Sequence, residues 1–519
     1  MRILNKEMLT AHGNRKGRKI VAELLDAGMD ALDPYVRVKK LVRLENNRII
    51  LDDRGFEMRG DPHAGPAVYD LKDYDRVFVV GAAKGVQRAA LAMEEALGDA
   101  LTGGHVIAKH GEEKICKKIG VTFAGHPVPD ACCVEGCREI EEIARGTTSR
   151  DLVFTITGSG CGSLMTYPVE GVSIEDIAAF THMMQIEKGV PTSELNQIRT
   201  HIDRFKGGRL SRLLRPATLV HMTTADPAKL GVPVLRASYF EMLRKNTFFP
   251  PLAAGSTYQD CLNILHKWDA WEKTPASIRE HLLHGGPENE NMSVAEYETL
   301  GARFFGLIFK DNTVYPAVRE KARELGYPCR MLSEYMEAEA AEAGRVNAQL
   351  ALCCERMGEP FQGPVVLMTS GENVVTVGNE RGIGGRNQEY CLSAALQIAG
   401  SRKIVFGAVD TDGTDGPGGL QIPGAPGCLA GAIIDGETAA EARAAGLELA
   451  AALNTDKPAI ARRTASLERK GYLRREPNPA DGRSQLLYAT AQAEGLRNAK
   501  ADAESAFYDY LMAGLDEAT

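Results

Sequence analysis

The chain lacks the features of a membrane or secreted protein. No apolar run among its 519 residues is long enough to span a bilayer, and the first residues lack the apolar core of a signal peptide. Neither sign of charge dominates strongly: the net charge of −8 gives no general attraction to nucleic acid or anionic membranes. We therefore expect a cytoplasmic protein with no membrane partner, and its length predicts two or three domains.

No Cys-x-x-Cys pair occurs among the eleven cysteines. Cys132, Cys133 and Cys137 are predicted to lie on one helix. Because structural zinc sites usually contain such a pair, we expect free thiols in a reducing compartment rather than zinc.

The two common nucleotide-binding motifs are also missing. No GxxxxGK[ST] loop is present, and the first strand–turn–helix unit (residues 76–97) lacks a full GxGxxG. The next predicted strand (104–108) runs into Lys109 rather than into the acidic residue that binds a ribose. The turn of the first unit carries Lys84, which we expect at the carboxyl edge of a parallel sheet. A solvated turn lysine is the alternative.

Alternating helices and buried strands fill most of the chain and predict an α/β fold. We expect a helix at 20–32, a hairpin around 48–51, and strands at 151–156, 364–368 and 404–409. A helix at 317–325, a strand at 327–332 and a long helix at 334–356 precede the last two strands.

A glycine-rich turn follows the strand at 151–156. Its residues Gly158, Ser159 and Gly160 could hold a phosphate through backbone N–H groups and a hydroxyl. A second anion site is predicted further along, where Asn196 and Arg199 share one helix face. The candidate clamp for a carboxylate or phosphate is completed by Lys206 and Arg209, which flank two glycines. A surface helix with solvated charges is the alternative.

The stretch 384–416 combines a glycine turn, a helix start, a buried strand and three carboxylates. The glycines Gly384 and Gly385 precede Arg386, and unpaired N–H groups at a helix start favour an anion. After the strand come Asp410, Asp412 and Asp415, whose hard oxygens suit Mg²⁺ shared with substrate phosphates. Together they predict phosphoryl transfer. Ordinary turn formers at strand ends are the alternative.

This stretch, GGRNQE followed by TDGTDG, resembles the glycerate 2-kinase family whose second domain is called MOFRL. The similarity extends to the Lys84 turn, to residues 125–130 (GHPVPD) and to the pattern from Glu194 to Arg209. The resemblance implies ATP- and Mg²⁺-dependent phosphorylation of the 2-hydroxyl of D-glycerate or of a related small hydroxy acid. It also implies two Rossmann-like α/β domains (1–300 and 301–450) with the site in the cleft between them.

The resemblance assigns roles to individual residues. It implies that Lys84, Arg386 and Asp410 are catalytic and that Asp412 and Asp415 bind the metal. Substrate or nucleotide binding falls to Gly158, Ser159, Gly160, Asn196, Arg199, Lys206, Arg209, Glu372, Gly384, Gly385, Asn387 and Glu389.

Two site loops depart from the family pattern. Ser159 and Cys161 interrupt its triple glycine, and a strand end that usually carries two acids offers only Asp226. These changes leave open a catalytically impaired, ligand-sensing regulator. A hydroxypyruvate reductase using NAD(P)H is a further alternative, against which the missing dinucleotide fingerprint argues.

The tail (451–519) does not follow the family. We expect two helices between 449 and 473, a basic hairpin with a Pro/Asp/Gly tip, and a long amphipathic helix after 491, an order that resembles half of a MarR-type winged helix. Between residues 461 and 484 it has seven Lys or Arg against three acids, a basic patch of the kind that phosphate contacts need. The chain lacks the N-terminal dimerisation helices of MarR proteins, so we expect a helical remnant rather than a DNA-binding module. The sequence does not determine the oligomeric state, and a homodimer is one arrangement it allows.

Overall fold

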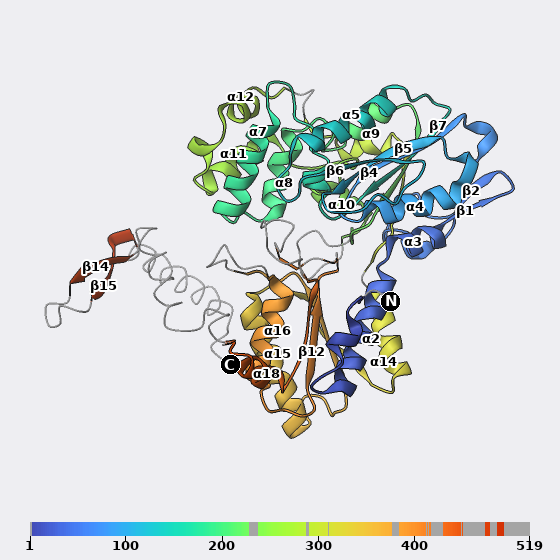
Figure 1. The fold of residues 1–519 in the computed structure, drawn as a ribbon. Helices are drawn as coiled ribbons and strands as arrows, with labels where there is room; N and C mark the ends of the chain where they lie inside the picture. Colours follow the sequence, from blue (N-terminus) through green and yellow to red (C-terminus); the bar gives the residue numbers. More distant parts are fainter. Residues whose placement is uncertain are drawn as a thin grey trace, which may run out of the picture.

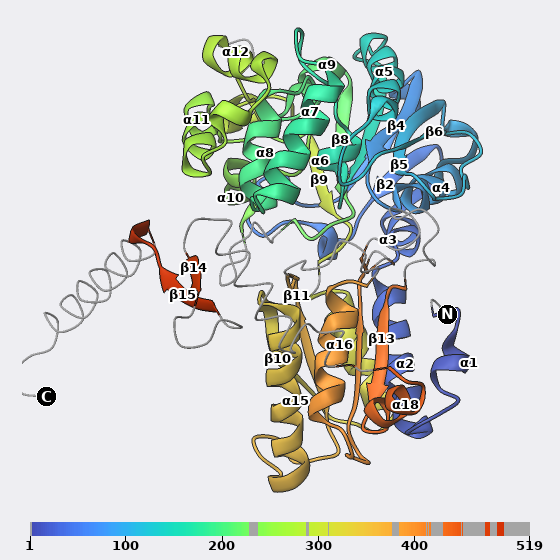
Figure 2. The same ribbon diagram turned by 60° about the vertical axis from the view of Figure 1, so that its left-hand side comes forward.

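The computed structural model describes residues 3–227, 237–286, 290–309, 311–375, 384–411, 413, 415–416, 429–447, 449, 473–477 and 485–492. Two α/β parts make up most of the molecule, one above the other in Figures 1 and 2. The expected α/β class with two α/β parts is confirmed.

A six-stranded parallel sheet forms the centre of the first part. Its strand order is β6-β5-β4-β7-β8-β9. The strands are β4 (Arg76–Ala82), β5 (Gly103–Lys109), β6 (Gly120–Ala124), β7 (Asp151–Thr157), β8 (Thr218–Thr223) and β9 (Arg303–Gly306). From β4 the chain adds strands on one side and then, from β7, on the other.

Helices cover both faces of this sheet. On β7, Leu152 and Phe154 pack with α3 (Pro34–Leu41) and α4 (Val86–Leu97), whereas Val153 packs with α5 (Ala131–Arg145) and α9 (Arg209–Leu214). Such alternation with apolar residues on both faces is the pattern of a buried parallel strand. The first part therefore has three layers, with a hydrophobic core on each side of the sheet.

Smaller elements border this sheet. An antiparallel sheet of β1 (Val42–Glu45), β2 (Arg48–Leu51) and β3 (Ala67–Asp70) includes the predicted hairpin. A separate apolar cluster is formed by α7 (Ile174–Thr181), α8 (Thr192–His201), α11 (Tyr258–Lys267) and α12 (Ala276–His284). Among the described residues, this part also contains the short α-helices α6 (Cys161–Leu164), α10 (Tyr239–Lys245) and α13 (Val294–Glu298).

The second part contains two pairs of strands between helices. Strands β10 (Cys329–Met336) and β11 (Val366–Gly371) run parallel, and β12 (Val405–Val409) and β13 (Gly431–Asp435) run antiparallel. One face packs against α15 (Ala340–Met357) and α16 (Arg386–Gln397), the other against α2 (Arg15–Ala31) and α14 (Val314–Glu324). The short helices α1 (Lys6–Leu9) and α18 (Thr438–Ala444) complete it.

The N-terminal helix α2 thus packs on the second part, although it begins the chain (Figure 1). Arg18 donates from Nε to Asp435 Oδ2 at 2.6 Å and from a terminal nitrogen to Ile433 O at 3.0 Å. Both charged side chains are almost fully buried. Removing one partner of such a pair would cost about 3–5 kcal/mol, because the other charge would stay buried alone. The domain boundary at residue 300 remains a prediction.

One boundary differs from the sequence prediction. Residues 334–336 were expected at the start of a long helix, yet they extend β10, where Met336 pairs with Gly371 of β11. The helix α15 begins only at Ala340. Pairing with a neighbouring strand outweighs the local helix preference here.

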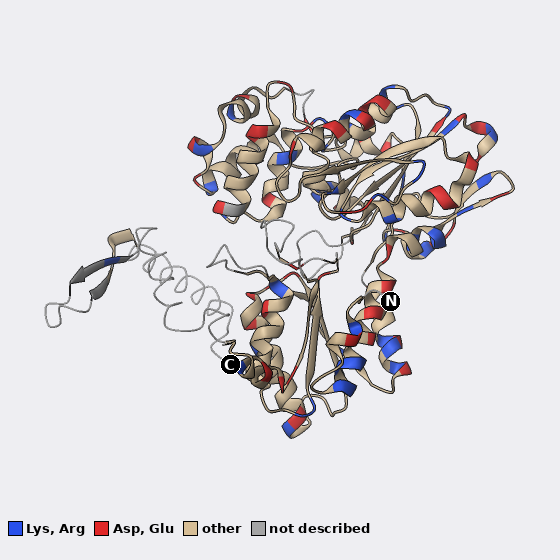
Figure 3. Cartoon of the chain, viewed as in Figure 1, with Lys and Arg blue, Asp and Glu red and all other residues tan. Residues whose placement is uncertain are grey.

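The predicted basic hairpin of the tail is present. Strand β14 (Leu473–Pro477) pairs antiparallel with β15 (Gln485–Ala489), and Leu473 lies opposite Ala489. The helices expected at 449–473 and after 491 fall mostly outside the described residues. Among the described residues, no helix is long and apolar enough to cross a membrane. In the view of Figure 3, acidic and basic residues are interspersed over both α/β parts.

Candidate functional site: a cleft between the two parts

The reversal of strand order between β4 and β7 creates a crevice at their carboxyl ends. Ligands of open α/β sheets bind at such a position, because the loops of the two strands diverge there. The turn after β4 carries Lys84, and the turn after β7 carries Gly158, Ser159 and Gly160. The Lys84 backbone N–H donates to Ser159 O at 2.8 Å, which joins the two turns. The structure therefore brings together two segments that the sequence singled out separately.

Gly158 is required by close packing in this crevice. A Cβ at this position would lie 1.9 Å from Thr224 Oγ1 and 3.2 Å from the Cβ of Ala83. Thr224 follows β8, and its backbone N–H donates to Thr157 O at 2.8 Å. Three strand ends thus meet at the glycine turn, and a larger residue there would push them apart.

Arg199 is a buried cation that lines the cleft. Its guanidinium donates to Asn196 Oδ1 at 3.1 Å and to Thr181 Oγ1 at 3.4 Å. Among the described residues, no carboxylate accepts a hydrogen bond from it; Asp203 favours its charge without contacting it and is itself paired with Lys206. Burial lowers the pKa of Arg199 to about 10, so it remains charged at neutral pH. A buried charge that lacks a directly bound counter-ion is costly, and an anionic ligand would compensate it.

Lys206 and Arg209 do not line the cleft; both are bound by neighbouring groups of the first part. The Lys206 ammonium forms a buried ion pair with Asp203 and donates to Met165 O at 2.5 Å. Arg209 donates to the carbonyls of Thr200 at 2.6 Å and of Lys206 at 2.5 Å. These contacts hold the connection between α8 and α9, and the ligand clamp proposed for this pair remains a prediction.

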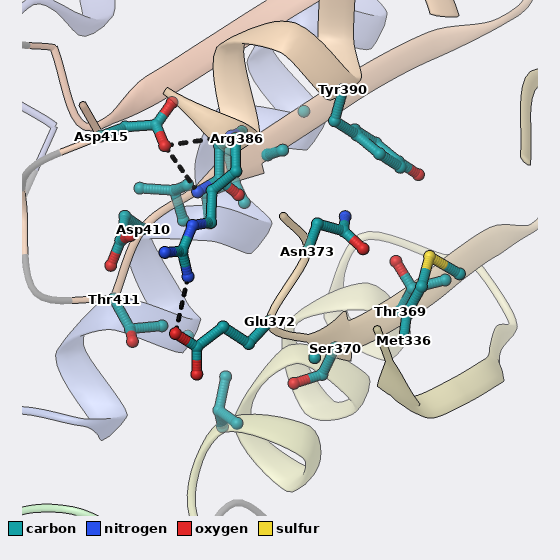
Figure 4. A pocket seen from close by; sticks show the side chains of 18 of the residues that line it. Met336, Thr369, Ser370, Glu372, Asn373, Arg386, Tyr390, Asp410, Thr411 and Asp415 are labelled. Atoms are coloured by element: carbon teal, nitrogen blue, oxygen red, sulfur yellow. Dashed lines mark hydrogen bonds and ion pairs between the residues drawn. The ribbon is translucent and has the colours of Figure 1, made fainter. Parts of the chain in front are cut away.

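Across the cleft, Arg386 lies at the start of α16 (Figure 4). It donates to Glu372 Oε1 at 2.7 Å, and Glu372 follows β11. Burial disfavours the charge of Arg386, but Glu372, with Asp410 and Asp415 nearby, raises its pKa above the ordinary value. The Glu372 side chain is 76% exposed. Such a solvent-exposed pair contributes roughly 0–1 kcal/mol, so an incoming anion could replace Glu372 at little cost.

Asp415 caps α16. Its Oδ1 accepts from the backbone N–H of Asn387 at 3.0 Å and from Asn387 Nδ2 at 3.2 Å, and its Oδ2 accepts from the Gln388 N–H at 2.7 Å. The side chain is almost fully buried. The start of α16 was predicted to bind an anion, and the Asp415 carboxylate of the chain itself occupies that position.

Gly385 and Gly416, which belong to the GGRNQE and TDGTDG segments, allow this contact. A Cβ on Gly385 would lie 2.5 Å from the Asp415 carbonyl carbon, and a Cβ on Gly416 would lie 2.3 Å from Gly384 O. The backbones of the two loops are in direct contact, so these glycines are needed for the packing of one loop against the other.

The other predicted residues of this part differ in position. Asn387 and Asp410 line the cleft, whereas Glu389 does not. Burial, and then the nearby Glu339, raise the pKa of Glu389. Asp412 lies outside the described residues.

The cleft has a volume of about 2290 Å³ and is lined by residues from both parts. A pocket for one small ligand typically occupies about 300–1,000 Å³, so the cleft has room for a nucleotide and an acceptor together. Residues that the sequence analysis did not assign also line it, among them His126, Thr224 and Tyr335. His126 belongs to the 125–130 motif, so the resemblance of this motif to the family was the feature of the sequence that could have indicated it.

Asp410 and Asp415 are the two carboxylates of the predicted Mg²⁺ group that the structure describes. Asp410 follows β12 and lines the cleft beside Arg386, a position suited to an ion shared with phosphate oxygens. Asp415 already directs both oxygens to α16. Of these two carboxylates, Asp410 is the one whose position suits Mg²⁺.

Comparisons with known proteins cover both parts. A family model described as a domain of unknown function (DUF4147) matches residues 20–283, and the MOFRL family model matches residues 365–471. The MOFRL match thus extends beyond the boundary expected at residue 450.

Two relatives and one solved structure show how far the similarity reaches. The glycerate 2-kinase of Pyrococcus horikoshii is 30% identical over 434 residues, covering 83% of this chain and 89% of that protein. The D-glycerate 2-kinase of Thermotoga maritima is 31% identical over 374 residues, covering 72% of this chain and 81% of that protein. The crystal structure of a glycerate kinase from Thermotoga maritima superimposes with a TM-score of 0.61 at 27% identity, covering 84% of this chain and 91% of that one.

Proposed function

Because the chain belongs to the glycerate 2-kinase family, with DUF4147 and MOFRL domains, we propose that it transfers the γ-phosphoryl group of ATP to the 2-hydroxyl of D-glycerate or of a related small hydroxy acid. The observation that carries this proposal is the pair of anion-binding groups facing one cleft. Lys84, the 158–160 turn and Arg199 line one side, and Arg386 with Asp410 lines the other.

Phosphoryl transfer depends mainly on positioning and on neutralising charge. In the proposed arrangement the 158–160 turn and Lys84 bind phosphate oxygens, and Arg199 binds an anionic group of the substrate. Arg386 exchanges Glu372 for a second substrate anion. Mg²⁺, held by Asp410 together with phosphate oxygens and with Asp412 as a further predicted ligand, would neutralise charge on the phosphates. The 2-hydroxyl oxygen attacks the γ-phosphorus, the bond to the bridging oxygen breaks, ADP leaves, and the hydroxyl proton passes to water.

The test is a coupled assay of ADP release with D-glycerate, L-glycerate and lactate, run beside NADH oxidation with hydroxypyruvate. We expect ADP release in proportion to the glycerate consumed, and no NADH oxidation. NADH oxidation without ADP release would overturn the kinase in favour of the reductase. Ligand binding without turnover in either assay would instead indicate the impaired, sensing protein.

We further propose that the tail beyond the MOFRL match is a remnant without a role in catalysis. Two observations support this proposal: none of the described tail residues lines the cleft, and Arg474 lies over the ring of Tyr488 at 5.4 Å, so that this cation has a partner within the hairpin itself. The likeness to a winged helix, the domain bounds and a homodimer remain predictions.

A further inference from the structure

Three side chains that can bind a metal converge at the edge of the first sheet, outside the cleft. His110 directly follows β5, and its backbone N–H donates to Ala124 O, the last residue of β6, at 3.0 Å. The loop after β6 ends at Asp130, the N-cap of α5, and Cys132 lies in the first turn of that helix. The adjacent strands β5 and β6 thus bring an imidazole, a carboxylate and a thiol to one place.

The three potential ligand atoms all lie within 4.8 Å of one another. His110 Nε2 is 2.7 Å from Asp130 Oδ2, so these two groups already face each other. The other oxygen, Oδ1, accepts from the Cys133 backbone N–H at 3.3 Å, which holds the carboxylate in place. The His110 and Asp130 side chains are 52% and 39% exposed, so an ion can reach them from solvent.

We propose that His110, Asp130 and Cys132 form a three-ligand site for a borderline-soft divalent ion of the Zn²⁺ class. Nitrogen, oxygen and sulfur ligands suit such an ion, with water in the fourth position of a tetrahedron. Mg²⁺ prefers oxygen ligands alone, so the thiolate separates this site chemically from the Mg²⁺ site proposed at Asp410. None of the three side chains lines the cleft, so the site does not depend on the proposed kinase activity.

A bound ion would stabilise the local structure because of where the site lies. It would connect the end of β5 to the start of α5, across the 125–130 loop. No sequence pattern marks the site, because the histidine lies twenty residues before the aspartate and no Cys-x-x-Cys pair is involved.

The test is a titration of the metal-free full chain with Co²⁺, followed by absorbance and then by competition with Zn²⁺. We expect a thiolate-to-cobalt charge-transfer band that saturates at one equivalent and disappears when Zn²⁺ is added. Cys132→Ser should abolish the band, and His110→Gln should weaken binding by at least about 100-fold, since even outer-shell changes cost about 10- to 100-fold. Zn²⁺ should also raise the unfolding temperature of the native chain but not of Cys132→Ser.

Cys353→Ser is the matched control, because Cys353 is another partly exposed free thiol, on α15 of the second part. This variant should bind Co²⁺ like the native chain. Circular dichroism checks that each variant is folded. A titration without a thiolate band at one equivalent would overturn the proposal. So would a band that survives in Cys132→Ser or disappears in Cys353→Ser.

Discussion

Replacement of Asp415 distinguishes a helix cap from a metal ligand. The sequence favoured a Mg²⁺ ligand, whereas the structure directs both carboxylate oxygens to N–H groups of Asn387 and Gln388. We expect Asp415→Ala to loosen α16 and Asp415→Asn to loosen it less, because the amide retains one acceptor oxygen. If Asp415 instead holds the metal, both variants should mainly raise the Mg²⁺ concentration required for activity.

The magnitude follows from the contacts. Losing an N-cap costs about 0.5–2 kcal/mol, and leaving a buried N–H without a partner costs about 1–3 kcal/mol. The negative charge at the helix start adds about 0.3–1 kcal/mol. These contributions overlap, so we expect about 2–4 kcal/mol for Asp415→Ala and about 1–2 kcal/mol for Asp415→Asn. Water cannot readily replace the carboxylate, because the side chain is almost fully buried.

Hydrogen exchange of the α16 amides is the suitable assay. A loss of 2–4 kcal/mol in local stability accelerates exchange by about 30- to 700-fold. The only two tryptophans, Trp268 and Trp271, lie in the first part, so their fluorescence reports whether that part unfolds unchanged. We expect the fluorescence midpoint in urea to match that of the native chain.

Asp410→Asn serves as the control, since Asp410 lines the cleft and the N–H groups of Asn387 and Gln388 donate to Asp415. It should leave α16 exchange unchanged. Native-like exchange of α16 in Asp415→Ala, together with a raised Mg²⁺ requirement, would refute the capping argument and restore Asp415 as a metal ligand.

Four further predictions concern the cleft and the tail. Lys84→Ala or Arg386→Ala should each lower turnover about 10²- to 10³-fold with the circular dichroism spectrum unchanged, since each removes a charge that stabilises the transition state; near-native turnover would exclude that residue. Asp410→Asn should raise the Mg²⁺ concentration for half-maximal activity, and full activity in excess EDTA would exclude a metal role. Arg199→Ala should lower kcat/KM about 10- to 150-fold, because it removes a charged hydrogen bond. In the native chain, Arg199 should stay charged until the pH rises through about 10, so kcat/KM should fall for this reason only above that pH. An unchanged kcat/KM in the variant would show that Arg199 does not belong to the site. Labelled duplex DNA should bind weakly, without sequence preference and with a steep loss as salt rises; tight selective binding abolished by Arg474→Ala would overturn the remnant proposal.

Local patterns in the sequence predicted the elements of the first part well. Buried apolar runs marked β4, β5 and β7, and the glycines and polar residues after β4 and β7 indicated two turns that could bind a ligand. Long-range packing was not accessible in this way. Nothing near α2 indicates that it packs on the second part, because Arg18 and its partner Asp435 are 417 residues apart. The charges of Lys206 and Arg209 suggested a ligand clamp, although their partners are close in the sequence: Asp203 lies three residues before Lys206. Residue type and spacing did not show that these contacts are formed inside the protein rather than with a ligand.

The ambiguity of the glycine–aspartate signature has a physical origin. A helix cap and a metal site both need carboxylate oxygens on loops whose glycines permit close approach, so residue type and spacing look the same for both. Only the position of the donors separates them, and here the N–H groups of Asn387 and Gln388 reach Asp415. The same contact joins the loop after β12 to the start of α16. Asp410 and Arg386 therefore lie on two segments of one hydrogen-bonded unit, and a change at Asp415 should disturb the proposed metal and anion positions together.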